Sequence, residues 1–372
     1  MQILVHRLRE ALGLLGPVVP KKHTLPVLTS ILLGNGRAVA TDLETTIAVE
    51  LPEAEGQCTM PFRETADLLK YVPADKLLAV EQKGEKLELA WPGGRASYKT
   101  HDPEDYPPLP EVKARVEQAV DGDTLVPVLL VVAEYCATDS SRPVLTGVAL
   151  TLGESVEVAA GDGFRMAYQT LPISFPPGEG TDRVILPAKA IRILGRLWKR
   201  TPKTAPAADS LVQLVTARRQ LVLALGDGLL EARFGSVCMI AKLIEGSPPN
   251  FRQLIPQDAP HKVRALAPDF ERALRQVREV AKDSYGTVRL IWSEAEMTVQ
   301  AKGKEKGEVE TAFSVGTEGG PGRIAVNCSY MLDYLRGKEG LVAMGVRGPQ
   351  DPILFHYGAS PLVLIMPMFV QW

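Results

Sequence analysis

The chain has 372 residues, of which 45% are hydrophobic and 23% charged, and its formal net charge is −2. This composition is ordinary for a globular protein, and the length suggests two or three domains. Because acidic and basic residues nearly balance, net charge cannot attract nucleic acid; such a role requires charges segregated on different faces.

Targeting signals and disulfides are not expected. The first residues carry several charges, unlike a signal peptide. A membrane helix needs about 20 apolar residues, and no apolar run approaches that length. Four cysteines stand singly, without a CxxC pair, which indicates reduced thiols. These features predict a cytoplasmic protein.

The first third of the chain alternates helical and strand patterns. Apolar residues recur at helical spacing in residues 5–15 and again in 61–72. Short runs separated by glycine or polar turns predict strands. The predicted strands are 31–33, 38–40, 45–50, 77–81, 86–91 and 95–100.

The rest of the chain repeats this order of elements. Helices are predicted at 128–138, 186–200, 268–282 and 327–336. Strands are predicted at 211–216, 220–225, 229–234, 287–292, 296–301, 308–315, 341–346, 353–357 and 362–366, and loops at 175–180 and 201–206. We therefore expect an α+β protein of three similar domains, at 1–115, 116–257 and 258–372.

One segment of the sequence occurs twice. Pro26-Val27-Leu28-Thr29 recurs as Pro143-Val144-Leu145-Thr146, and Asp42 recurs as Asp162. The offsets, 143 − 26 = 117 and 162 − 42 = 120, are nearly constant. Self-similarity at this period, close to the length of a small domain, indicates repeated domains rather than a solenoid.

Basic residues follow one face of several predicted helices. At 100° per residue they form stripes opposite the apolar residues, although Glu271 and Glu279 interrupt the apolar side of the third-domain helix. For one helix a solvated face is the better interpretation; two stripes at equivalent places favour a lining that follows phosphates. Aromatic residues are missing from these faces, which argues against single-strand binding. The basic residues are Arg63, Lys70, Lys189, Arg192, Arg196, Lys199, Arg200, Arg272, Arg275, Arg278 and Lys282.

Catalytic and metal-binding patterns are missing from the sequence. The five histidines are far apart, and no phosphate-binding glycine loop or nucleophile elbow is present. Asp121-Gly122-Asp123 resembles a carboxylate pair, but we assign it to an interdomain linker. Asp162 with Arg165 could suggest catalysis, yet Asp42 occupies the same place in the repeat. We expect no enzymatic activity, cofactor or metal.

Several separate motifs resemble the bacterial DNA polymerase III β subunits, the sliding clamps. The similarity covers nearly the whole chain. The motifs are Thr24-Leu25-Pro26-Val27-Leu28, Thr41-Asp42-Leu43-Glu44, Asp162-Gly163-Phe164-Arg165-Met166-Ala167, Pro249-Asn250-Phe251-Arg252 and Met366-Pro367-Met368. The resemblance implies the DNA clamp fold, with two helices packed on antiparallel sheets in each domain and a head-to-tail homodimeric ring around duplex DNA. It implies no catalysis. The implied partners are double-stranded DNA without sequence preference, the polymerase III alpha subunit, the clamp loader and other proteins with clamp-binding motifs.

The resemblance also implies a pocket for partner peptides between the second and third domains. By position, the pocket residues are Arg142, Leu145, Gly161, Gly163, Phe164, Arg165, Met166, Pro249, Gln253, Leu254, Leu364, Ile365, Met366, Pro367 and Met368. Lys22 falls where the family has a DNA-contacting arginine. Phe164, Gly161 and Gln253 depart from the usual residues, and the ending, Phe369 to Trp372, is longer and more apolar than usual. These departures leave the preferred partner motif open.

Two functions are compatible with these features. The first is a processivity clamp around duplex DNA, and the second is a diverged clamp-fold scaffold that binds peptides without encircling DNA. For the ring, we expect the strand edge with Arg95 and Lys99 to meet the edge with Glu308 and Glu310 in a second copy. The basic stripes favour the first function, and the altered pocket leaves room for the second.

Overall fold

The computed structural model describes residues 1–176, 183–201 and 219–372. The predicted strand at 211–216 and most of the predicted loops at 175–180 and 201–206 lie outside these residues. The described chain forms two compact units. The first unit is Met1–Leu130, Leu152–Glu154 and Ile173–Glu245; the second is Val131–Thr151, Ser155–Pro172 and Gly246–Trp372.

The first unit contains two sheets, ordered β1-β6-β7-β8 and β5-β2-β3-β4-β16-β15-β14-β9. The strands of these sheets are β1 (Gln2–Leu4), β2 (Ser30–Gly34), β3 (Arg37–Thr41), β4 (Thr45–Glu50), β5 (Gln57–Pro61), β6 (Leu77–Lys83), β7 (Lys86–Trp91), β8 (Gly94–Lys99), β9 (Val116–Asp121), β14 (Gln220–Gly226), β15 (Leu229–Phe234) and β16 (Val237–Lys242). The unit also contains β13 (Arg183–Pro187), which belongs to neither of these sheets. The helices are α1 (Val5–Leu15), α2 (Phe62–Leu69), α3 (Gly122–Ala133), of which the last three residues belong to the second unit, and α4 (Ala188–Arg200).

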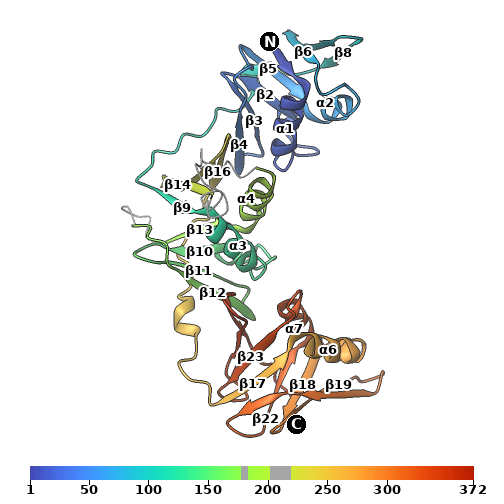
Figure 1. Cartoon of the computed structure of the whole chain (residues 1–372), viewed down its shortest axis with the longest axis vertical. Helices are drawn as coiled ribbons and strands as arrows, with labels where there is room; N and C mark the ends of the chain where they lie inside the picture. The colour runs from blue at the N-terminus through green and yellow to red at the C-terminus, as the bar shows by residue number, and fades with distance from the viewer. Residues whose placement is uncertain (177–182, 202–218) are drawn as a thin grey trace, which may run out of the picture. The chain divides into compact units, whose positions relative to one another are not determined.

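The helices of the first unit are amphipathic and bury one face. In α1 the apolar residues at helical spacing, among them Leu8, Leu12 and Leu15, are at most 4% exposed and pack toward β3, β4 and α2 (Figure 1). In α4, Leu194 and Trp198 are likewise buried. Burying such side chains contributes about 1.5–3 kcal/mol each. The charged faces of these helices are therefore left to solvent.

The second unit has a similar construction. Its strands are hydrogen-bonded to their neighbours in the order β10-β11-β12-β25-β24-β23-β17-β21, and a further sheet has the order β20-β19-β18-β22. The strands are β10 (Gly147–Thr151), β11 (Val156–Gly161), β12 (Arg165–Leu171), β17 (His261–Leu266), β18 (Thr287–Trp292), β19 (Glu296–Lys302), β20 (Glu308–Ser314), β21 (Gly316–Glu318), β22 (Gly322–Asn327), β23 (Leu341–Val346), β24 (Ile353–His356) and β25 (Leu362–Ile365). The helices are α6 (Ala267–Ala281) and α7 (Cys328–Leu335), and α6 packs on α7, β19 and β20.

The sequence repeat is also a structural repeat. The short 3-10 helices η1 (Pro26–Thr29) and η3 (Pro143–Leu145) begin the two copies. In each copy the threonine hydroxyl, of Thr29 or Thr146, donates to the carbonyl of the leading proline, at 2.8 and 2.7 Å. The matching residues therefore hold the same local backbone in both copies.

The helix–strand order expected from the sequence is found, with corrections at a few boundaries. Residues 186–187 end β13 rather than begin a helix, since α4 starts at Ala188. Helix α3 covers 122–133 instead of 128–138, and Pro127 lies inside it. The strands β1, β5, β9, β13, β16, β17, β21 and β22 were not predicted, since they are short or lack a clear alternation, and no bounds were predicted for β10, β11 and β12.

The prediction that Asp121-Gly122-Asp123 is a linker is wrong. β9 ends at Asp121 and α3 begins at Gly122. The Asp123 carboxylate accepts hydrogen bonds from Trp198 Nε1 at 3.2 Å and Arg219 Nη2 at 2.8 Å. The Arg219 guanidinium also stacks 4.1 Å from the Trp198 ring centre. This segment is thus a packed junction whose carboxylate has a structural role.

We predict that Gly122→Ala destabilises the protein. A Cβ at residue 122 would lie 2.2 Å from Cη2 of the buried Trp198 ring, so the ring must shift away from Asp123 and Arg219. Overpacking of this kind costs about 1–3 kcal/mol. Urea unfolding measures the change. The control is Gly316→Ala, where no atom lies within 4 Å of the added Cβ; equal stabilities of the two variants would contradict the packing role.

Candidate functional site

A tight turn joins β11 to β12 and presents Phe164. The Asp162 carboxylate accepts the backbone N–H groups of Phe164 and Arg165, at 2.9 and 3.0 Å. Gly163 has φ +96°, a conformation that glycine adopts without steric cost. The Phe164 side chain stands out from this turn with 62% of its surface exposed.

A buried apolar floor supports the turn. Its members come from segments far apart in the sequence. They are Leu145, Ala149, Ala159, Met166, Phe251 and Leu364. A Cβ on Gly161 would lie 3.1 Å from the Phe251 ring, so glycine at this position makes room for the ring. Leu145, Met166, Leu364 and Ile365 are thus buried, and we expect them to support a bound peptide from beneath.

Large apolar side chains are exposed in the same segments that supply this floor. Leu254 is 54% exposed and Met366 is 42% exposed. The Met366 N–H donates to the Phe164 carbonyl at 2.8 Å, so these two residues lie on adjacent backbone. Leu254 ends the 3-10 helix η4 (Phe251–Leu254), whose first residue lies in the floor. Grouped exposed apolar side chains mark interaction sites. We call Phe164, Leu254, Met366 and the floor the docking surface.

The other predicted pocket residues surround the docking surface as more polar or less exposed groups. Arg142, Pro249 and Gln253 are exposed, whereas Pro367 and Met368 are half-buried. Arg142 lies beside the turn, since its Nη1 would be 3.6 Å from a Cβ on Gly163. We expect these groups to contact the polar parts of a peptide.

The first repeat has the same turn with different chemistry. The Asp42 carboxylate accepts the backbone N–H groups of Glu44 and Thr45, at 3.1 and 2.7 Å. Leu43 adopts φ +72°, the left-handed conformation that Gly163 has in the second copy. The sequence repeat indicated a shared position for the two aspartates, and the hydrogen bonds confirm it.

This correspondence identifies the residues that replace the exposed apolar groups. The Lys242 N–H donates to the Glu44 carbonyl at 3.0 Å, as the Met366 N–H does to Phe164. Glu44 and Lys242 are exposed. The first repeat therefore presents a carboxylate and an ammonium group where the second presents a phenyl ring and a thioether.

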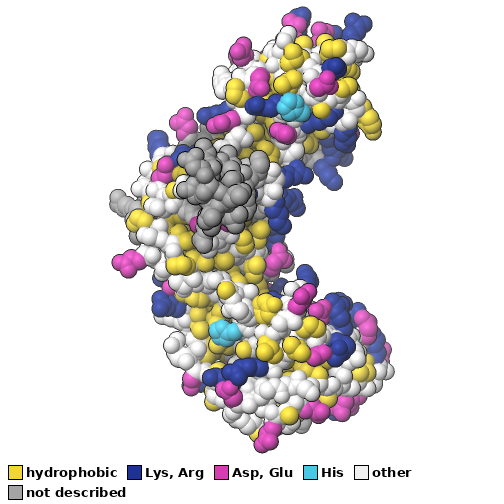
Figure 2. Space-filling model, viewed as in Figure 1, with side chains coloured by type: hydrophobic (Ala, Val, Ile, Leu, Met, Phe, Trp, Pro, Cys, Tyr) yellow, Lys and Arg dark blue, Asp and Glu magenta, His cyan; other side chains and the backbone are white. Residues whose placement is uncertain are grey.

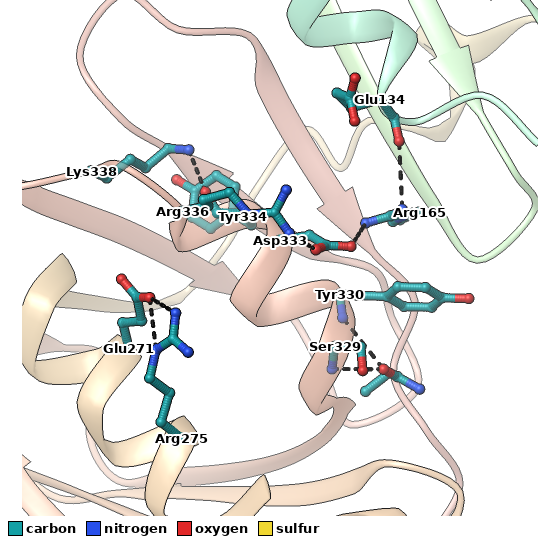
Figure 3. A network of polar contacts seen from close by, with 11 residues as sticks. Glu134, Arg165, Glu271, Arg275, Ser329, Tyr330, Asp333, Tyr334, Arg336 and Lys338 are labelled. Carbon is teal, nitrogen blue, oxygen red and sulfur yellow. Dashed lines mark hydrogen bonds and ion pairs between the residues drawn. The ribbon is translucent and has the colours of Figure 1, made fainter.

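Arg165 connects this turn to helix α7 (Figure 3). Its Nε lies 3.2 Å from Asp162 Oδ2 and its Nη1 lies 2.9 Å from Asp333 Oδ2. The guanidinium carbon is 5.3 Å from the Tyr135 ring centre and 4.7 Å from that of Tyr330. Two ion pairs and two ring contacts thus hold one side chain.

The Arg165 side chain is only 14% exposed. Burial by itself would lower the pKa of Arg165, but the hydrogen bonds with Asp333 and Asp162 raise it, so the guanidinium stays charged. Burial raises the pKa of Tyr135 to about 12, so its phenol stays neutral. The resemblance implied that Arg165 contacts the peptide; in this geometry its contacts are within the chain, and we infer that it supports the turn.

The sequence did not point to Tyr135, Tyr330 or Asp333. Tyr330 and Asp333 are three residues apart in α7 and therefore lie on one face, a signal that could have been noticed. Their partner, Arg165, is 168 residues away from Asp333 in the chain. No local pattern could have paired them.

The basic residues of α4 gather on the helix-bearing side of the first unit (Figure 2). Lys189 pairs with Asp42 at 2.6 Å, and Arg200 donates to the Gly13 carbonyl at the end of α1. A groove of about 600 Å³ is lined by Leu12, Gly13, Gly16, Pro17, Phe62, Arg196, Lys199 and Arg200. Arg192 is also exposed. This face is positive and concave, as a phosphate-binding surface requires.

The basic face of α6 is partly neutralised. Arg272 pairs with Asp269 at 2.7 Å and Arg275 with Glu271 at 2.6 Å. Lys282, which follows the helix, pairs with Glu279 at 2.5 Å, whereas Arg278 lies on the same face. Exposed pairs of this kind contribute about 0–1 kcal/mol each, so the cations can exchange partners.

The remaining predicted DNA-facing residues and the edge residues are exposed. Lys22 and Arg63 are exposed, and Lys70 pairs with Asp67 at 2.5 Å. β8 and β20 are edge strands of their sheets. The residues predicted for the contact between copies lie on these two strands. Within the chain, Lys99 pairs with Glu85 and Glu308 pairs with Lys302. Glu310 accepts a hydrogen bond from Gln300, and Arg95 is exposed.

Within the described residues, no cluster of three or more histidine, cysteine, aspartate or glutamate side chains could hold a metal ion. Over the same residues, the helices are too short or too polar to cross a membrane.

Comparisons with known proteins agree on one family. Residues 119–250 match the family model described as DNA polymerase III beta subunit, central domain, and residues 252–364 match the model of its C-terminal domain. The Beta sliding clamp of Escherichia coli (strain K12) is 26% identical over 343 residues, which cover 89% of this chain and 87% of that protein. That of Chlamydia muridarum is 25% identical over 94% of this chain and 93% of its own. The crystal structure of the DNA polymerase III subunit beta from Pseudomonas aeruginosa has a TM-score of 0.86 and 25% identity, covering 100% of this chain and 99% of that one.

We predict that Arg165→Ala destabilises the second unit. The substitution leaves Asp162 and Asp333 without their shared cation and removes both ring contacts. Breaking a partly buried pair of this kind costs about 2–4 kcal/mol. Urea unfolding and exchange of the Phe164 amide measure the effect.

Arg336→Ala is the matched control for Arg165. Arg336 pairs with the same Asp333, at 2.7 Å, but is 74% exposed. We expect its loss to change the unfolding free energy by less than about 0.5 kcal/mol. An equally small effect at Arg165 would contradict the proposed support of the turn.

Proposed function

The chain belongs to the family of DNA polymerase III beta subunits, the sliding clamps, and from this premise we propose that it encircles duplex DNA and tethers the replicative polymerase. A clamp acts by holding its partners and DNA together, and the chain catalyses no reaction in this role. Its partners are duplex DNA, a second copy of itself, the polymerase III alpha subunit, the clamp loader and other proteins with clamp-binding motifs. The expected location is the cytoplasm, where bacterial DNA is replicated.

The docking surface is the observation that carries the proposal. Exposed Phe164, Leu254 and Met366 lie in the segments that supply a buried apolar floor, and the Asp162 carboxylate accepts hydrogen bonds from the backbone of the turn. Apolar anchors of a short peptide fit such a surface, because burial of a few large side chains dominates peptide binding. The methionines are adaptable, which suits several partners.

We propose that two copies close into a ring through their sheet edges. β8 carries Arg95 and Lys99, and β20 carries Glu308 and Glu310, so the edges have opposite charge. Pairing of edge strands satisfies backbone groups that are otherwise exposed. The in-chain partners of Lys99 and Glu308 are exposed and weak, and can be exchanged across such an interface.

DNA contact would be sequence-independent. The exposed basic faces of α4 and α6 can follow phosphates, which carry no base information. Each phosphate contact releases a counterion, so affinity should fall steeply with salt. A chain of net charge −2 should bind free duplex weakly and depend on ring closure for retention.

One observation favours a second function. Three basic residues on or next to α6 already have carboxylate partners, at Asp269, Glu271 and Glu279, which weakens the positive face. A diverged clamp-fold scaffold that binds peptides without encircling DNA would tolerate this neutralisation. The two functions share the docking surface and differ in retention on DNA.

We predict that Met366→Ala and Leu254→Ala weaken binding of a short peptide. The probe is a fluorescein-labelled hexapeptide that ends in Leu-Phe, and anisotropy measures its dissociation constant. Loss of an exposed apolar anchor should cost about 1–3 kcal/mol, or about five- to 150-fold in affinity. Lys242→Ala, at the equivalent position of the first repeat, is the matched control and should leave the affinity unchanged. Equal affinities for all variants would place peptide binding elsewhere.

We predict retention on circular but not linear DNA. After loading onto nicked circular plasmid with a clamp loader and ATP, the protein should co-elute with DNA at moderate salt, because a closed ring is held by topology. A single cut should release it. Retention that survives linearisation would indicate charge-driven binding, and failure to load, with a loader active on its own clamp, would favour the scaffold.

A further inference from the structure

A segment that follows β25 leaves the docking surface and crosses the second sheet of the second unit. The Met368 N–H donates to the Ala325 carbonyl of β22 at 2.8 Å. The Thr287 hydroxyl donates to Met368 Sδ at 3.5 Å. Residues 367–372 therefore run beside β22, an edge strand of its sheet. We call residues 367–372 the anchor segment.

The end of the anchor segment is held by two arginines. The Arg323 guanidinium carbon lies 4.7 Å from the Trp372 ring centre, and that of Arg289 lies 6.0 Å from it. Arg289 Nη2 also donates to the Gln371 carbonyl at 3.2 Å. Arg289 of β18 lies opposite Ala325 of β22. Arg323 is two residues before Ala325 on β22, so both arginines project from one face of the sheet. An indole ring over two guanidinium groups is a favourable cation–π arrangement.

Pro367 connects this anchorage to the docking surface. Its neighbour Met366 donates its N–H to the Phe164 carbonyl, and Met368 donates to β22. Proline fixes its own φ and restricts the residue before it to extended conformations. Fewer backbone dihedrals are therefore free between Met366 and Met368, so a displacement of Met368 is absorbed less easily between them.

We propose that Trp372 is a positioning residue for the docking surface: its contacts with Arg289 and Arg323 hold the anchor segment on the sheet, and Pro367 thereby fixes the direction of Met366. This inference rests on the proposed peptide-docking function and adds to it a determinant outside the surface itself. A fixed Met366 binds a peptide without first being ordered, and such pre-organisation strengthens binding. Of the two aromatic residues in the segment, Trp372 contacts both arginines, whereas the Phe369 side chain is 88% exposed. We therefore assign the anchorage to Trp372.

The test combines peptide affinity with amide exchange in the full chain. For Trp372→Ala we expect the dissociation constant of the Leu-Phe hexapeptide to rise about three- to tenfold. We also expect faster hydrogen exchange at the amides of Met366 and Met368. Trp372→Phe, which keeps a ring over the arginines, should restore most of both properties, and Arg323→Ala should reproduce the loss. Phe369→Ala is the matched control and should leave both exchange rates unchanged.

Two results would overturn the inference. Weaker binding in Trp372→Ala with unchanged exchange at both amides would mean that Trp372 touches the peptide itself. Unchanged affinity and unchanged exchange would mean that the anchorage has no effect on the surface. If the unmodified chain does not bind the hexapeptide, the proposed docking function fails, while the exchange rates still decide whether Trp372 anchors the segment.

Discussion

The hydrogen bonds that two backbone amides donate to the Asp162 carboxylate are the constraint on which the docking surface depends. They close the turn between β11 and β12, so that Phe164 is presented and its carbonyl accepts the Met366 N–H. Arg165 connects the same carboxylate to Asp333 of α7. A charge-assisted bond is about twice as strong as a neutral one, and the accepting Asp162 side chain is only 17% exposed. These bonds hold the backbone of the exposed turn in one conformation, which would lower the entropy lost if a peptide binds there, as proposed.

The duplicated turn separates backbone geometry from surface chemistry. The Asp42 carboxylate accepts the two equivalent backbone hydrogen bonds in the first repeat. The hydrogen bond from the Lys242 amide to the Glu44 carbonyl matches the one from Met366 to Phe164. The exposed residues differ: Glu44 and Lys242 replace Phe164 and Met366. Charged groups remain hydrated and gain little from an apolar peptide, so we expect the proposed docking at the second repeat rather than at the first. In the first repeat the carboxylate of the turn, Asp42, forms an ion pair with Lys189.

Much of this fold could be predicted from the sequence because its signals are local. Helical spacing of apolar residues located α1 and α6 to within one residue at each end, and the repeat located both turns. Long-range polar pairings could not be predicted: Arg165 meets Asp333 only through the tertiary fold, and Gly122 is packed against Trp198, far along the chain. The basic stripe on α6 was visible, but its neutralisation by Asp269 and Glu271 depends on side-chain conformations. The contact between β8 and β20 of two copies and the domain boundaries stay predictions.

The central claim is that the exposed side chains, and not the backbone that both repeats share, decide where a peptide binds. Exchanging these side chains between the two repeats tests this claim most directly. The measurement is the dissociation constant of the Leu-Phe hexapeptide for a chain with Phe164→Glu and Met366→Lys, and for that chain with Glu44→Phe and Lys242→Met added. We expect the first exchange to weaken binding more than about tenfold, since it removes two apolar anchors. The second should restore measurable binding at the first repeat. Unchanged affinity after the first exchange would contradict this account.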